Sequence, residues 1–192
     1  SVLGSLAVDR PGLRVPGSAD GFDQAVRTIL GQRVTLAAGC TLARRFNERF
    51  ATLTHYAARP QTIAALDDAG LETIGRLGIL RAQARAIVAL ARAMTEGDLD
   101  LSPGADPQAA IAALLRLPGV GPWTAQTLAM RALGWADAFP PGDVAILRML
   151  DVKQDRDAQR LAEAWRPWRS YAVMHLWHRY LERGSVRAPR AR

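Results

Sequence analysis

The residues most able to do chemistry lie in the stretch Leu117–Ala125, LPGVGPWTA, which holds two glycines and two prolines. Gly119 and Gly121 allow positive φ angles or a close approach of the backbone to another surface. Pro122 suits the first position of a following helix, so the amides of residues 119–123 would point outward at a helix N-terminus. Such a turn can hold a phosphate. An ordinary turn between two helices, with glycine as a cap, explains the same residues, and this stretch alone does not separate the two readings.

Lysine and cysteine, which serve as nucleophiles and metal ligands, are scarce in the chain. Of 25 basic residues only Lys153 is a lysine, and its polar surroundings, DVKQDRD, are typical of a solvated charge rather than of an amine nucleophile. Cys40 is the sole cysteine, which excludes an intramolecular disulfide, a four-cysteine zinc site and a four-cysteine iron–sulfur cluster. The histidines His55, His175 and His178 lack a metal-binding pattern, so we expect no metal site built from side chains.

The elements around these residues are predicted to be helices throughout the chain. Apolar residues recur at helical spacing, strand-like alternation is absent, and Gly97 and Gly134 mark two helix ends. Residues 98–105 and 136–143 read as loops. We therefore expect an all-α fold of about ten helices, over residues 20–30, 34–50, 60–68, 71–77, 79–97, 106–116, 122–134, 144–150, 156–165 and 170–183.

The balance of charge indicates a polyanionic partner. The 192 residues carry a formal net charge of +7, and a basic balance of this kind favours nucleic acid. Richness in Ala, Leu and Arg, which GC-rich coding produces, is the alternative explanation. No apolar run approaches the length of about 20 residues that spans a membrane, and no signal peptide is visible. We expect a globular, cytoplasmic, monomeric protein without membrane contact.

Four motifs in order resemble the helix-hairpin-helix DNA glycosylase superfamily, and within it the 3-methyladenine-DNA glycosylase II branch. They are residues 10–34, which resemble the opening of the helical core, the hairpin at 117–125, Asp143 beyond it, and residues 165–177 near the C-terminus. The resemblance covers residues 8–182. It implies an all-α glycosylase core that contains a helix-hairpin-helix DNA-binding motif.

The resemblance also implies how the chain is divided. Residues 13–183 would form the catalytic core, with two helical lobes and the active site between them. Residues 1–12 would be a lead-in, and residues 184–192 a basic, disordered tail. Full-length bacterial members of the branch usually carry a β-rich domain before the core, and we expect that domain to be missing from this chain.

The implied activity is the release of alkylated bases, such as 3-methyladenine and 7-methylguanine, from double-stranded DNA in base excision repair. Such an enzyme flips the nucleotide into a pocket and breaks its bond to deoxyribose, which leaves an oxocarbenium-like sugar. Asp143 would stabilise that sugar and orient the attacking water; its alternative role is the N-cap of the helix over 144–150. Trp123 and Trp177 would line the base pocket, where aromatic faces attract cationic bases. Thr127 would also contact the base, at a position where the branch often has an aromatic residue, and its smaller side chain would widen the pocket.

The resemblance further implies how the protein holds DNA. Bifunctional relatives have a catalytic lysine at the position of Trp123, so its absence implies a monofunctional enzyme without lyase activity. Leu117, Gly119, Val120 and Gly121 would bind the DNA backbone. A sodium or potassium ion between a phosphate and the carbonyls of Leu117 and Val120 is a feature of many such hairpins, and no other cofactor is expected.

A wedge residue is expected to fill the gap that the flipped base leaves. In the branch it follows a Gly-Gln pair and is typically apolar, whereas this chain has Gln32 and then Arg33, both of which we expect to contact DNA. Arg33 would fill the gap or meet a phosphate, with an ordinary surface arginine as the alternative.

Two other functions stay open: a glycosylase for a mismatch or an oxidised base, and a non-catalytic module that binds DNA. For each of these functions we expect the partner to be double-stranded DNA. We expect the protein to act at the nucleoid, in a bacterial cytoplasm.

Overall fold

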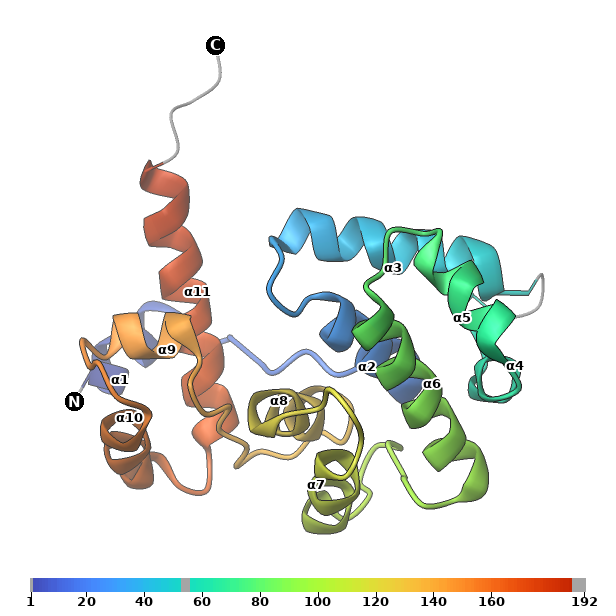
Figure 1. The fold of residues 1–192 in the computed structure, drawn as a ribbon. Coiled ribbons are helices and arrows are strands. Elements are labelled where there is room, and N and C mark those ends of the chain that lie inside the picture. The colour runs from blue at the N-terminus through green and yellow to red at the C-terminus, as the bar shows by residue number, and fades with distance from the viewer. Residues whose placement is uncertain (1, 53–55, 188–192) are drawn as a thin grey trace.

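The computed structural model describes residues 2–52 and 56–187, and in these ranges the chain forms eleven α-helices and one short 3-10 helix (Figure 1). The prediction of an all-α fold is confirmed, while His55 and residues 188–192 of the predicted tail lie outside the described residues. The elements are α1 (Val2–Asp9), α2 (Gly21–Leu30), α3 (Leu36–Phe50), α4 (Pro60–Ala64), α5 (Asp68–Gly75), α6 (Arg81–Glu96), α7 (Pro107–Leu115), α8 (Pro122–Arg131), α9 (Val144–Met149), α10 (Asp155–Ala162), η1 (Glu163–Trp165) and α11 (Arg169–Arg187).

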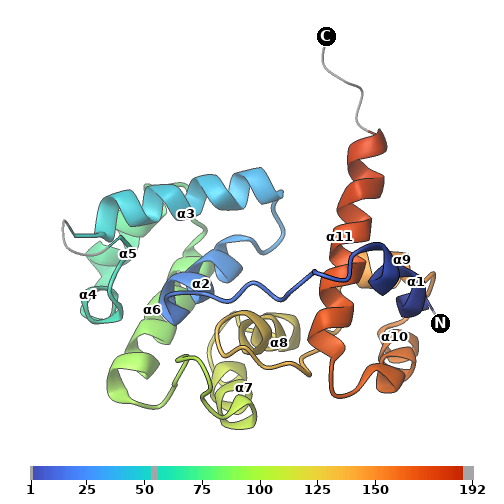
Figure 2. The ribbon, with the colours of Figure 1, turned by 180° about the vertical axis from the view of Figure 1, so that it is seen from behind.

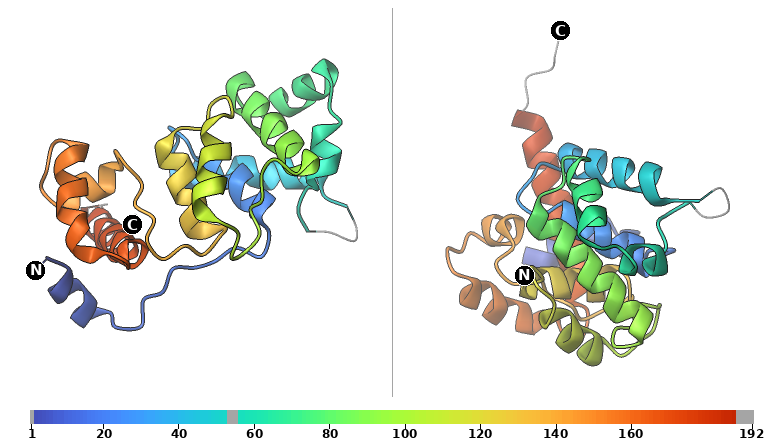
Figure 3. Two further views of the ribbon diagram at one scale, coloured as in Figure 1. Left: turned by 90° about the horizontal axis from the view of Figure 1, so that it is seen from below. Right: turned by 45° about the vertical axis from the view of Figure 1, so that its right-hand side comes forward.

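The helices form two groups with a helical hairpin between them (Figures 1 and 2). Helices α3, α4, α5 and α6 lie on one side, and α1, α9, α10 and α11 lie on the other. Helices α7 and α8 form the hairpin, and α8 packs against α2. Because α1 packs against α11, the two ends of the described chain belong to the same group (Figure 3).

Local sequence signals explain where several helices begin and end. The side chains of Asp20, Thr35 and Asp106 each accept a hydrogen bond from a backbone amide in the first turn of the helix that follows. Helix α6 ends at Gly97, whose φ of 85° is the left-handed conformation that glycine adopts without strain. The predicted boundaries at Asp20, Asp106 and Gly97 are confirmed.

The segment around Asp67 differs from the prediction. The sequence predicts a helix over residues 60–68, but α4 ends at Ala64 and α5 begins at Asp68. The side chain of Asp67 accepts a hydrogen bond of 2.9 Å from the amide of Gly70, and this bond caps a new helix. The apolar spacing in this segment therefore belongs to two helices with a short turn between them.

Two helix ends also lie elsewhere than the sequence predicts, and one helix was not predicted. Helix α8 ends at Arg131 instead of Gly134, because the chain turns there and Gly134 has a φ of 74°. Helix α1 lies within the predicted lead-in, and α11 continues to Arg187, past the predicted start of the tail. Helix α1 is stabilised by packing against α11, a contact between segments that are distant in the sequence.

The core holds the hairpin in place against the first group of helices. Ile29 and Leu30 of α2, Ile87 and Leu90 of α6 and Leu128 of α8 are all fully buried. Burying one such side chain contributes about 2 kcal/mol, so this cluster fixes α8 relative to α2 and α6. Among the described residues no helix is long and apolar enough to cross a membrane.

Candidate functional site

Asp143 lies between the loop that follows α8 and the start of α9, and it is 8% exposed. Its Oδ1 accepts a hydrogen bond of 2.9 Å from the amide of Ile146, so the side chain caps α9. Its Oδ2 accepts a hydrogen bond of 2.8 Å from the indole Nε1 of Trp123. The cap that the sequence suggests is present, and the second oxygen is bound to a residue of the predicted base pocket.

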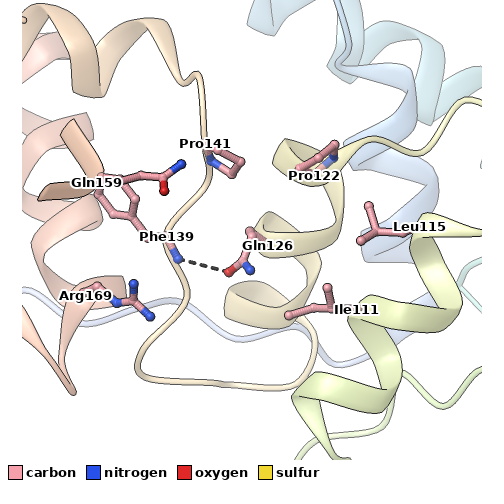
Figure 4. Close-up of a pocket in the computed structure, with 8 residues that line it drawn as sticks. All are labelled: Ile111, Leu115, Pro122, Gln126, Phe139, Pro141, Gln159 and Arg169. Atoms are coloured by element: carbon pink, nitrogen blue, oxygen red, sulfur yellow. Dashed lines mark hydrogen bonds between the residues drawn. The ribbon is translucent and has the colours of Figure 1, made fainter. Parts of the chain in front are cut away.

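Side chains of two helices accept hydrogen bonds from backbone amides of the loop that carries Asp143. The Oγ of Ser170, in α11, accepts a hydrogen bond of 3.0 Å from the amide of Ala138. The Oε1 of Gln126, in α8, accepts one of 3.1 Å from the amide of Phe139 (Figure 4). These bonds fix the course of the loop before it reaches Asp143.

A partly buried ion-pair cluster ties the same loop to α11. Arg169 donates from Nε to Oδ1 of Asp137 at 2.7 Å, and Arg166 donates to Oδ2 of Asp137, also at 2.7 Å. Burial raises the pKa of Asp137, but the hydrogen bond and charge of Arg169, together with the charge of Arg166, hold that pKa below its ordinary value. Asp137 is therefore an ionised anchor rather than a proton donor.

A cavity of about 500 Å³ lies among α2, α3, α8 and α11. Trp123 and Thr127 line it from α8, and Trp177 lines it from α11, so the three residues predicted for the base pocket come together. Its volume is in the range that small-molecule ligands occupy. Because Trp123 also donates a hydrogen bond to Asp143, the carboxylate is in contact with a residue that lines this cavity. The remaining lining residues are Gln24, Arg27, Thr28, Gly31, Val34, Leu36, Gly39, Cys40, Ala43 and Arg131.

The sequence motifs did not point to Arg131. It lies eight positions after Trp123 on the same helix, so the spacing Trp123, Thr127, Arg131 could have indicated a shared face. Burial lowers the pKa of Arg131, and its Nε is buried without a hydrogen-bond partner among the described residues. A guanidinium group keeps its charge in proteins, so the cavity contains a cation.

The hairpin between α7 and α8 shows why one of its two glycines is required by the fold. Gly119 has a φ of 76°, and a Cβ there would lie 3.3 Å from the Cβ of Ala86. Gly121 has a φ of −99° and is the extended residue before α8, so of the two roles expected for it the close approach of the backbone to another surface stays a prediction. A Cβ on Gly121 would meet no atom within 4 Å, so this position opens to space outside the protein.

The other hairpin residues face inward or hold the turn. Val120 is buried at 7% exposure, and its amide donates a hydrogen bond of 3.3 Å to the carbonyl of Leu117. The amides of Gly119 and Gly121 donate no hydrogen bond to any residue that the structure describes. The turn therefore presents free backbone amides next to the N-terminus of α8.

Gln32 and Arg33 lie in the turn between α2 and α3, and they differ in their surroundings. Gln32 donates from Nε2 to the carbonyl of Gly119 at 3.2 Å and to Oγ1 of Thr124 at 2.9 Å, so it ties this turn to the hairpin. Arg33 is exposed and has a φ of 58°, which is unusual for a residue other than glycine. Leu36, which lines the cavity, is 76% exposed and was not singled out from the sequence.

A second cavity, of about 190 Å³, opens on a different face of α8 (Figure 4). Pro122 and Gln126 line it from α8, Leu115 from α7, and Arg169 from α11. Positions 122 and 126 are each one residue before the positions of Trp123 and Thr127, so they face about 100° away from the larger cavity. None of the predicted site residues lines this second cavity.

The remaining candidates for chemistry lie apart from Asp143. Lys153 is exposed in the turn before α10, and Cys40 is an exposed free thiol. The pKa of His175 lies below its ordinary value because of burial and of the nearby charge of His178. His178 lies 3.6 Å from a carboxylate oxygen of Glu182. Within the described ranges no group of three or more His, Cys, Asp and Glu side chains is arranged to hold a metal ion.

Comparison with known proteins relates the chain to DNA repair enzymes. The family described as "HhH-GPD superfamily base excision DNA repair protein" matches residues 26–170. DNA-3-methyladenine glycosylase 2 of Escherichia coli K12 is 38% identical over 182 residues, which cover 92% of this chain and 64% of that protein. A probable bifunctional transcriptional activator/DNA repair enzyme AlkA of Mycobacterium tuberculosis is 41% identical over 180 residues, covering 87% of this chain and 35% of that protein. The chain thus spans less than two thirds of either relative.

Solved structures show the same fold. The Schizosaccaromyces pombe 3-methyladenine DNA glycosylase Mag1, in complex with abasic DNA, superposes with a TM-score of 0.75 at 18% identity and covers 92% of this chain and 90% of that one. The 3-methyladenine DNA glycosylase of Archaeoglobus fulgidus superposes with a TM-score of 0.71 at 20% identity, over 91% of this chain and 64% of that one. Family match and fold agree with the motifs, and the chain belongs to the HhH-GPD superfamily of base excision DNA repair proteins.

Proposed function

We propose that the chain is a monofunctional DNA glycosylase that releases alkylated bases, of the 3-methyladenine and 7-methylguanine type, from double-stranded DNA. The observation that carries the proposal is the 2.8 Å hydrogen bond from Trp123 Nε1 to Asp143 Oδ2, which joins a carboxylate to an aromatic wall of the larger cavity. Relatives in Escherichia coli and Bacillus subtilis that are named as 3-methyladenine glycosylases support this substrate class.

The aromatic walls of the cavity suit a cationic base. A purine methylated at N3 or N7 carries a positive charge, and the faces of Trp123 and Trp177 attract it by stacking and by cation–π interaction. The same charge makes the base a good leaving group, so its departure needs no strong general acid. Thr127 lines the cavity with a hydroxyl that donates to the carbonyl of Trp123 at 2.8 Å, and this smaller side chain leaves room for the base.

Asp143 acts on the sugar that the base leaves behind. Departure of the base builds positive charge at C1′ of the deoxyribose, and a fixed carboxylate stabilises that charge. The bonds from Ile146 and Trp123 hold the carboxylate in one orientation, so little reorganisation is needed as the charge develops. The oxygen lone pairs that these two bonds leave free orient the water that attacks C1′.

The hairpin holds the DNA backbone beside the cavity. A phosphate accepts hydrogen bonds from the amides of Gly119 and Gly121, at the positive end of α8, and the open space beside Gly121 admits it. A sodium or potassium ion bridges that phosphate to the carbonyls of Leu117 and Val120. The net charge of +7 adds a long-range attraction to DNA.

The turn between α2 and α3 fills the gap left by the flipped nucleotide. Arg33 enters the duplex as the wedge, with the exposed Leu36 beside the cavity mouth as its apolar neighbour. Gln32 supports it indirectly, because its amide links this turn to Gly119 and Thr124. These bonds thus hold the turn that carries Arg33 in a fixed position relative to the hairpin.

Trp123 stands where bifunctional relatives have a lysine, and the amine of Lys153 is exposed beyond α9, so the reaction stops at an abasic site. Residues 13–183 form the catalytic core, with the cavity between its two groups of helices. The protein acts as a monomer on the DNA of a bacterial cytoplasm. It differs from a lyase in leaving the strand intact.

Incubation with methylated duplex DNA tests this function. We expect free methylpurines in solution, and strand breaks only after alkali treatment of the product. Breaks without alkali would show lyase activity, and tight binding without base release would show a module that binds DNA but does not act on it. Activity confined to duplexes with a mismatch or an oxidised base would assign the second substrate class.

A further inference from the structure

Two arginines line the larger cavity, and they differ in their partners. Arg27 donates from Nε to Oδ2 of Asp23 at 2.6 Å, and Asn47 donates to the other oxygen of Asp23 at 2.8 Å. The charge of Arg27 is therefore paired. Arg131 forms no ion pair within the described part of the chain, and its Nε is buried without a hydrogen-bond partner. Arg131 is thus a cavity-lining cation with unused donors.

Arg131 lies at one end of a row of cavity-lining residues on α8. Trp123, Thr127 and Arg131 follow one another at intervals of four residues, so they share a face of α8 that lines the cavity. The rise of 1.5 Å per residue separates the first from the last by about 12 Å along the helix. The carboxylate of Asp143 lies at the Trp123 end. A base whose sugar meets Asp143 therefore directs its outer edge toward Arg131.

That outer edge differs chemically between the two purines. Guanine carries a carbonyl oxygen at C6, which accepts hydrogen bonds, whereas adenine carries an amino group there, which donates them. A guanidinium group has five N–H donors and no acceptor, so it pairs with the carbonyl and not with the amino group. Resting on the proposed function, we propose that Arg131 is a specificity-determining residue that favours alkylated guanine over alkylated adenine.

The proposal is tested by the ratio of two bases released from one DNA sample. DNA treated with a methylating agent contains both 3-methylguanine and 3-methyladenine, which are methylated at the same atom and are both cationic. We would measure the relative kcat/KM for the two bases with the wild-type protein and with Arg131→Met, an uncharged side chain of similar length. Loss of a hydrogen bond to a charged donor should lower the ratio of 3-methylguanine to 3-methyladenine about tenfold.

Two further variants serve as controls. Arg27→Met removes the paired cation from the same cavity and should leave the ratio unchanged. Arg131→Lys keeps a charge and a donor, and its ratio should lie between those of the wild type and Arg131→Met. Because both bases compete for one enzyme in one sample, the ratio does not depend on how much of a variant is folded. If Arg131→Met were too unstable to assay, the shift in Arg131→Lys would be the readout.

The outcomes separate this proposal from the proposed function. If the wild type releases both bases and the ratio is the same in the Arg131 variants, Arg131 does not read the base, although the glycosylase activity stands. If Arg27→Met shifts the ratio as much as Arg131→Met, the unpaired donor is not the cause. If the wild type releases neither base, the proposed function itself fails.

Discussion

The indole Nε1 of Trp123 donates a hydrogen bond of 2.8 Å to Oδ2 of Asp143, and the same indole lines the larger cavity. The amide of Ile146 holds the other carboxylate oxygen at 2.9 Å. One side chain thus contacts the space proposed for the base and orients the carboxylate proposed for catalysis. In the proposed function, Trp123 therefore acts both in base binding and in stabilisation of the sugar, which leads to a direct prediction.

Trp123→Phe should slow base release while leaving DNA binding nearly unchanged. The phenyl ring keeps an aromatic face on the cavity but removes the N–H that orients Asp143. Loss of a hydrogen bond to a charged acceptor should lower kcat about tenfold. Trp177→Phe is the matched control, because it also shrinks an indole on the cavity without removing a donor to Asp143. Equal losses of kcat in the two variants would show that the bond to Asp143 is unimportant.

The two hairpin glycines should respond differently to alanine. Gly119→Ala places a Cβ at a φ of 76° and 3.3 Å from Ala86, so we expect a loss of stability of about 1–2 kcal/mol. Gly121→Ala meets no atom within 4 Å in the protein and should leave the thermal midpoint unchanged. It should nevertheless weaken DNA binding, since the methyl group occupies space proposed for a phosphate. Unchanged DNA affinity in Gly121→Ala would remove the hairpin from the DNA interface.

Asp137→Asn should lower stability at neutral pH and flatten the dependence of stability on pH. Although burial raises the pKa of Asp137, Arg169 and Arg166 hold it below the ordinary value of about 3.9. The stabilisation from this pair is thus fully present above that ordinary pKa and is lost as pH falls through the lower folded pKa. Without the carboxylate charge, the nearly buried guanidinium of Arg169 keeps only the carbonyl of residue 137 and the 3.6 Å contact with the exposed Glu163, which costs about 2 kcal/mol.

Thermal unfolding of both proteins between about pH 7 and pH 3 checks this. The wild-type midpoint should fall at the acid end by more than that of Asp137→Asn. Glu72→Gln is a suitable control, because Glu72 pairs with Arg76 at 3.9 Å on the exposed surface and should contribute little. If Asp137→Asn matched Glu72→Gln in stability, the anchor of the loop before Asp143 would lie elsewhere.

The elements that local signals define could be predicted from the sequence. The caps at Asp20 and Asp106 and the stop at Gly97 depend only on neighbouring residues, so their positions follow from residue type. The break between α4 and α5 was predicted at residues 69–70 instead of 65–67, because Asp67 reads equally well as a helix interior residue and as a cap. The helix α1 was missed because its packing partner, α11, lies at the other end of the chain.

The candidate site was predicted by resemblance more than by local chemistry. Spacing alone indicates Asp143 as a helix cap, and the contact with Trp123 depends on how the loop between α8 and α9 folds back. Asp137 and Arg169, which form an ion pair, are 32 residues apart in the sequence, so no local pattern indicates their contact. The contact of Gln32 with DNA stays a prediction, and the hydrogen bond from its amide to the hairpin could not be predicted because the two residues are far apart in the sequence.

The most direct test of the account is the single-turnover rate of base release by Asp143→Asn, with each protein in excess over the DNA at a concentration that saturates it. The amide has one acceptor for the two donors from Ile146 and Trp123, so part of the loss will come from orientation; Trp123→Phe measures that part. We predict a rate about a thousandfold below the wild type, well beyond the effect of Trp123→Phe, with DNA affinity retained. A rate within tenfold of the wild type would contradict the account, because the charge of Asp143 would then not stabilise the positive charge that develops on the sugar as the base departs.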